Sequence, residues 1–127
     1  MTLLARNTPN DVYRRVELEA RIGGSDPRQL VTLCYEQVIE ALGSALHAAG
    51  RDDNQGKSKS LTRALSALTA LQLGVSGNDG VSGALRHLYE ATRKALLDCV
   101  LSFDAAAITA IRKDFTEILH AMTGSTH

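Results

Sequence analysis

The sequence predicts an all-α protein: an antiparallel four-helix bundle preceded by a loosely attached N-terminal arm. Apolar residues recur at spacings of three and four through most of the chain, and alanine and leucine dominate these positions. The β-branched and aromatic residues that strands prefer are scarce, aromatic residues being 4% of the chain. A chain of 127 residues is long enough for one domain with a buried core. No segment reads as a strand.

The first predicted helix, residues 26–49, is the one around which we expect the others to pack. Asp26 is suited to accept hydrogen bonds from the first turn, Pro27 fits the first helical position, and Gln29 can complete a capping box. Two adjacent apolar rows follow: Leu30, Cys34, Val38, Leu42, Ala45 and Ala49, and beside them Val31, Tyr35, Ile39, Leu42 and Leu46. Because two rows make a wide stripe, this helix is expected to contact more than one neighbour.

Three further helices follow from the same spacing. We expect them over residues 57–73, over residues 81–101, and from Asp104 as N-cap to a stop at Gly124. Gly50 is expected to be the left-handed residue after the first helix, and residues 74–80 to be the most flexible connection. The expected division is therefore a partly flexible arm at 1–25, the bundle at 26–123 and a frayed end at 124–127.

Composition restricts the classes of partner. Fourteen basic residues balance fourteen acidic ones, which does not favour nucleic acid or an anionic membrane. No apolar run approaches the ~20 residues that cross a bilayer, and the first ten residues lack the features of a signal peptide. We therefore expect a cytoplasmic protein without membrane insertion, in which Cys34 and Cys99 are small buried thiols.

Few residues are candidates for chemistry. His87 is a candidate phosphate acceptor, because four-helix phosphotransfer domains carry an exposed histidine, but Glu90 stands where positive charge would be needed. Glu117 and His120 have the Glu-x-x-His spacing of di-iron bundles, which need two such pairs. With no glycine-rich phosphate loop or catalytic triad in context, the sequence predicts neither an enzyme nor a cofactor or metal site.

The motifs themselves resemble a known family. The run from Asp26 to Glu36 is similar to the opening "S-P-x-x-L-(I/V)-x-x-L-(Y/F)-(D/E)" of the flagellar export chaperone FliS family, and Tyr13 and Val16 match its Tyr-x-x-Val. The run from Leu85 to Glu90, with Leu96, Leu97 and Asp104, resembles a second family motif. The likeness covers residues 12–122. Cys99-Val100 stands where the family usually has Ala-Asn, and Met122 where it usually has Trp.

The resemblance implies a cytosolic chaperone that binds the disordered C-terminal region of flagellin, prevents its premature polymerisation and delivers it to the flagellar type III export apparatus. It also implies that the arm containing Tyr13 covers part of the client groove and can be displaced. The expected flagellin contacts are Tyr13, Leu42, Leu46, Leu65, Leu68, Leu71, Tyr89 and Leu96. We expect a monomer or a weak homodimer. The alternatives are a histidine phosphotransfer bundle using His87 and a generic helical dimerisation module.

Overall fold

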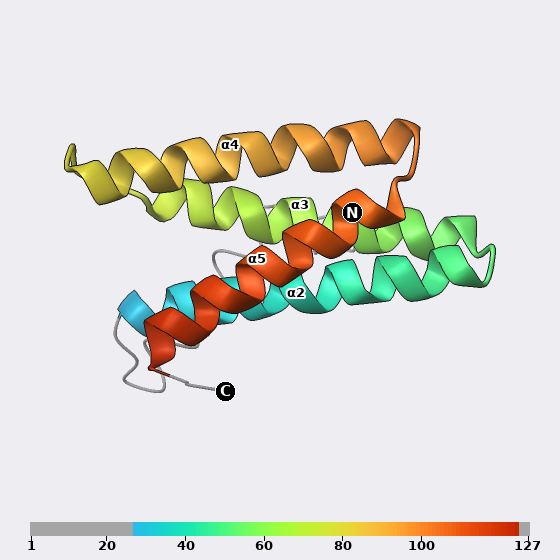
Figure 1. The fold of residues 1–127 in the computed structure, drawn as a ribbon, viewed down its shortest axis with the longest axis horizontal. Coiled ribbons are helices and arrows are strands. Elements are labelled where there is room, and N and C mark those ends of the chain that lie inside the picture. The colour runs from blue at the N-terminus through green and yellow to red at the C-terminus, as the bar shows by residue number, and fades with distance from the viewer. Residues whose placement is uncertain (1–26, 125–127) are drawn as a thin grey trace, which may run out of the picture.

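The computed structural model describes residues 27–124, which form four α-helices and no strand. The helices are α2 (Pro27–Gly50), α3 (Asn54–Gly74), α4 (Gly80–Leu101) and α5 (Ala105–Thr123). Successive helices run in opposite directions, and short connections join them at the two ends of an elongated bundle (Figure 1). The predicted all-α, antiparallel bundle is confirmed.

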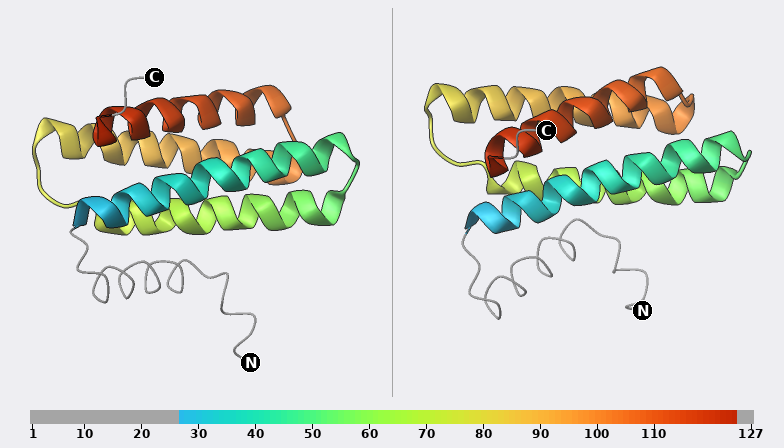
Figure 2. Two further views of the ribbon diagram at one scale, coloured as in Figure 1. Left: turned by 90° about the horizontal axis from the view of Figure 1, so that it is seen from below. Right: turned by 60° about the horizontal axis from the view of Figure 1, so that its bottom comes forward.

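Helix α2 has the most extensive packing in the bundle. It packs along α3 and then against α5, whereas α4 contacts α3 and, over a shorter stretch, α5. Figure 2 shows α2 beside α3 in both views, with α4 diagonally opposite α2. The expectation that this helix contacts more than one neighbour is confirmed.

An aspartate caps each of the three later helices. Its carboxylate accepts from a backbone N–H of the first turn, where no intrahelical partner is available. These hydrogen bonds run from Gly56 N to Asp53 Oδ1 (2.9 Å), from Ser82 N to Asp79 Oδ1 (2.7 Å) and from Ala107 N to Asp104 Oδ1 (3.1 Å). At the other end of α5, Gly124 takes the left-handed conformation with φ 77°. The predicted N-cap and stop of this last helix are confirmed.

Two predicted boundaries were wrong. Helix α3 begins at Asn54 rather than Lys57, because Asp53 supplies its cap three residues earlier than expected. Gly50 remains helical, and the residue with positive φ is Asp52, at 56°. Aspartate tolerates this region better than most residues, so the turn needs no glycine.

The connection between α3 and α4 is tied down by side chains. Ser82 Oγ donates to the Ser76 carbonyl at 2.7 Å, and Arg86 donates to the Gly77 carbonyl. Together with the Asp79 cap, these bonds hold the loop from the first turns of α4. Hydrogen bonds donated by Ser82 hold the pKa of the Asp79 carboxyl below its usual range. The glycine-rich composition predicts conformational freedom, but the neighbouring polar side chains oppose it.

Three aromatic rings fill the centre of the bundle. Tyr35, Tyr89 and Phe115 come from α2, α4 and α5, and all three are buried. Their ring centroids lie between 5.1 and 6.4 Å apart. The two tyrosine hydroxyls are 2.8 Å apart in a hydrogen bond that spans the bundle diagonal. Burial raises the pKa of both tyrosines, so both stay neutral.

Replacing one tyrosine of this pair should lower the free energy of unfolding more than replacing both. In Tyr89→Phe, the Tyr35 hydroxyl stays buried without its partner, which costs about 1–3 kcal/mol. In the double variant with Tyr35→Phe, no polar group is stranded. Urea unfolding followed by circular dichroism measures the three free energies of unfolding. If the loss in the double variant equalled the sum of the losses in the two single variants, the hydrogen bond would contribute nothing to stability.

Candidate partner-binding surface

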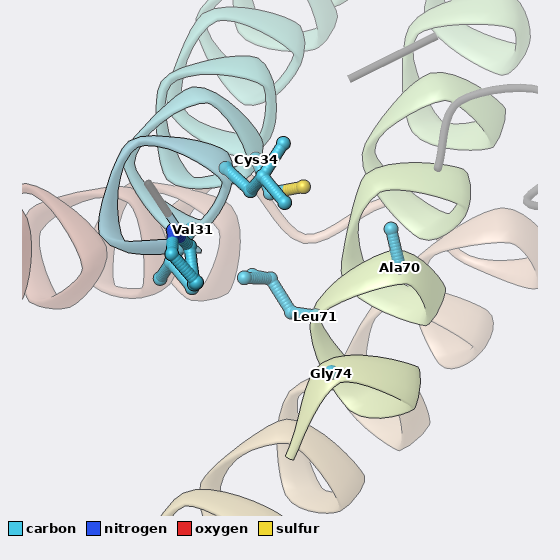
Figure 3. Close-up of a pocket in the computed structure, with 7 residues that line it drawn as sticks. Val31, Cys34, Ala70, Leu71 and Gly74 are labelled. Carbon is cyan, nitrogen blue, oxygen red and sulfur yellow. The ribbon is translucent and has the colours of Figure 1, made fainter. Parts of the chain in front are cut away.

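An apolar pocket lies where α2 begins and α3 ends. Its lining residues are Pro27, Leu30, Val31 and Cys34 of α2 and Ala70, Leu71 and Gly74 of α3. In Figure 3 the Leu71 side chain extends from α3 toward Val31 on α2, while Ala70 and Gly74 leave space beside it. The pocket therefore exists because small residues alternate with a large one on the last turns of α3.

The size and lining of this pocket define what it can bind. Its volume is about 120 Å³, and none of its lining residues in the described part of the chain carries a charge. An apolar cavity of ~150 Å³ holds one benzene-sized group. The pocket is therefore suited to a single apolar side chain supplied by a partner segment, and its lining offers no group for catalysis.

Cys34 forms part of the pocket wall, and its thiol is shielded. The residue is buried, and both Cys34 and Cys99 are free thiols, as expected. Burial raises the pKa of the Cys34 thiol to about 11. Since only the thiolate is nucleophilic, Cys34 contributes packing rather than reactivity.

Two open grooves run along either side of α5. The groove between α4 and α5 has a volume of about 390 Å³ and is lined by Leu88, Asp114, Glu117, Ile118 and Ala121. The groove between α2 and α5 has a volume of about 370 Å³ and is lined by Leu46, Thr109, Arg112, Lys113, Thr116, Glu117 and His120. The first carries carboxylates, whereas cationic side chains predominate in the second.

Several large apolar side chains are exposed outside these hollows. They are Leu73 on α3 and Val81, Leu97, Val100 and Leu101 on α4. Leu73 and Leu97 lie beside the main apolar rows of α3 and α4. Val100 stands where the related motif usually has asparagine, so this departure leaves an apolar side chain in solvent.

Most of the predicted flagellin contacts lie in the core. Leu42, Leu68, Leu71, Tyr89 and Leu96 are buried, and only Leu71 among them also lines the pocket. Leu46 and Leu65 are half-buried against the core, and Tyr13 lies outside the described residues. The buried residues share the apolar rows of α2, α3 and α4, where periodicity does not separate core from groove. Their role in binding stays a prediction.

The apolar periodicity of the sequence does not indicate the pocket itself. Pro27 predicts only a helix start, and Leu30 and Val31 belong to the two apolar rows of the first helix. The feature of the sequence that indicates the pocket is the pair Ala70 and Gly74, two small residues one helical turn apart at the end of α3. They face α2 and leave a hollow that larger side chains would have filled.

The two histidine candidates, His87 and His120, lie on α4 and α5. His87 is exposed on α4 between the half-buried Leu88 and the exposed Arg86. Among residues 27–124, no group of three or more histidine, cysteine, aspartate or glutamate side chains is arranged to hold a metal ion. None of the four described helices is long and apolar enough to cross a membrane.

Comparison with known proteins gives one result. Residues 9–123 match the family described as "Flagellar protein FliS". No curated protein matches the chain. The family match covers the whole of the described bundle and extends into the residues before it.

The shielding of Cys34 can be measured in a Cys99→Ala variant, which leaves it as the only thiol. With a pKa of about 11, roughly one Cys34 side chain in a thousand is ionised at pH 8. Disulfide exchange with Ellman's reagent should therefore be slow in the folded protein and should accelerate as the pH rises toward 11. Denatured protein is the control, since its thiol has an ordinary pKa. Equally fast reaction in both states at pH 8 would contradict the burial of this thiol.

Proposed function

We propose, because this chain belongs to the FliS family of flagellar proteins, that it binds the disordered C-terminal region of flagellin in the cytoplasm. The family implies a flagellar export chaperone for flagellin. In our proposal, the chain holds the flagellin segment away from other flagellin molecules and delivers it to the type III export apparatus. It acts as a monomer or a weak homodimer.

The observation that carries this proposal is the apolar pocket between α2 and α3. A disordered segment that folds on binding must offset an ordering cost of roughly 2–5 kcal/mol. An amphipathic helix recovers this cost by placing apolar anchors in hollows of its partner. A pocket of about 120 Å³ without charged lining provides one such anchor position.

The predicted contact residues differ in how they can act. Leu71 lines the pocket, and Leu46 and Leu65 are half-buried and offer their exposed parts to the client. The fully buried residues, Leu42, Leu68, Tyr89 and Leu96, act by holding the helices in place. To the predicted set we add Leu30 and Val31, which are half-buried at the pocket.

The arm before α2 provides a means of controlling access. Pro27 is both the first residue of α2 and part of the pocket lining, so the preceding chain is tethered at the pocket's edge. The arm carries Tyr13, an aromatic residue suited to an apolar site. We propose that this arm competes with the client for the pocket.

A charge in the pocket should abolish anchoring. We expect Val31→Glu to weaken binding of a peptide covering the C-terminal region of flagellin by at least about tenfold, because the carboxylate must lose water when the anchor enters. Calorimetry gives the dissociation constant, and circular dichroism reports the helix that the peptide gains.

The matched control is Leu101→Glu. Leu101 is 89% exposed at the far end of α4, so the same charge is added away from the pocket. Its affinity should equal that of the unmodified protein. Equal affinity of Val31→Glu and Leu101→Glu for the peptide would show that the pocket does not bind flagellin. If the unmodified, folded protein did not bind the peptide, the proposed function itself would be wrong.

Removal of the arm tests the competition. A variant lacking residues 1–24 should bind the flagellin peptide faster or more tightly, since no internal segment has to leave first. Stopped-flow fluorescence with a labelled peptide measures the association rate. An unchanged or weaker interaction would show that the arm does not compete.

A further inference from the structure

The groove between α2 and α5 combines an apolar floor with cationic side chains. Leu46 of α2 is its aliphatic contact, and Arg112, Lys113 and His120 of α5 lie around it. Among residues 27–124, Glu117 is the one carboxylate that lines the groove, so the two permanent cations, Arg112 and Lys113, outnumber it. The hydroxyls of Thr109 and Thr116 complete the lining.

Arg112 is held in a fixed position across α2. Its Nε donates to the Ile39 carbonyl at 2.9 Å, between two helices that are far apart in sequence. The guanidinium lies over Gly43, where a Cβ would come within 3.0–3.1 Å of its atoms. Gly43 therefore provides the space in which the guanidinium lies, although glycine in a helix interior costs about 0.5–1 kcal/mol.

The rest of this guanidinium is available for a ligand. Within residues 27–124, no carboxylate forms an ion pair or hydrogen bond with its two terminal nitrogens. A guanidinium binds a carboxylate through two parallel hydrogen bonds, and fixing its orientation beforehand reduces the entropy lost on binding. The neighbouring Lys113 and His120 add donors on the same face of α5.

We infer that this groove is a second docking site, which takes an acidic amphipathic helix from a partner protein. An aliphatic side chain of that helix packs on Leu46, and its carboxylates pair with Arg112 and Lys113. Leu46 is also one of the proposed flagellin contacts, but the groove shares no residue with the pocket between α2 and α3.

The probe is a synthetic helical peptide with leucines on one face and glutamates on both flanks. A matched peptide carries lysine in place of each glutamate. We expect the glutamate peptide to bind the full chain at least about tenfold more tightly, in a salt-dependent manner. In NMR spectra, the methyl signals of Leu46 should shift on binding, while those of Val31 in the other pocket should stay in place.

Three variants test the residues. Lys113→Glu, on the surface of α5, should weaken the glutamate peptide about tenfold, and Arg112→Lys about threefold, because lysine lacks the planar fork. Lys59→Glu makes the same charge change on the exposed side of α3 and should leave affinity unchanged. Circular dichroism verifies that each variant is folded.

Three results would overturn the inference. They are equal affinity for the two peptides, unchanged affinity in Lys113→Glu, or NMR shifts at Val31 instead of Leu46. None of them decides whether flagellin binds at the pocket between α2 and α3, because that is measured with a different peptide and with Val31→Glu.

Discussion

The hydrogen bond between Tyr35 and Tyr89 is the constraint on which the rest of the bundle depends. The helices that carry these residues, α2 and α4, face each other across the diagonal and have no close backbone approach. Two hydroxyls buried among apolar groups must meet, because each would otherwise be buried without a partner. Their pairing fixes the axial position of α4 relative to α2, and Phe115 brings α5 into the same contact.

The small residues of α3 set the shape of the surface. Ala64, Ala67 and Ala70 of α3 are buried, and α3 packs more extensively against α2 than against α4. At the end of α3, the small residues Ala70 and Gly74 leave space for the pocket that they line. Close packing in the centre and a hollow at the end are therefore two outcomes of one compositional feature.

Fold class and helix order could be predicted from the sequence because they depend on local signals. Asp104 and Gly124 mark their helix ends by chemistry that acts within a few residues. The turn lies at Asp52 and not at Gly50, and the local sequence does not distinguish them because aspartate and glycine both tolerate positive φ.

The surface was harder to predict than the fold. Leu42 and Leu46 are one turn apart on the same helix, yet the first is buried and the second lines a groove. The difference arises from how α5 crosses α2, which no local pattern encodes. Likewise, the sequence does not indicate that Gly43 lies beneath Arg112, because the contact joins segments far apart in the chain.

The hydrogen-bonded connection between α3 and α4 sets the direction of α4 separately from the packing of α4 against its neighbours. Ser82 Oγ and Arg86 donate to the carbonyls of Ser76 and Gly77, and the Ser82 N–H donates to the Asp79 carboxylate, which orients the first turn of α4. Polar groups at the N-terminal end of α4 therefore set the direction of this helix. Its packing against α3 and α5 is less extensive than that of α2 against α3. The exposed apolar side chains of Leu97 and Val100 take no part in these hydrogen bonds, so the surface of α4 and its direction are set by different residues.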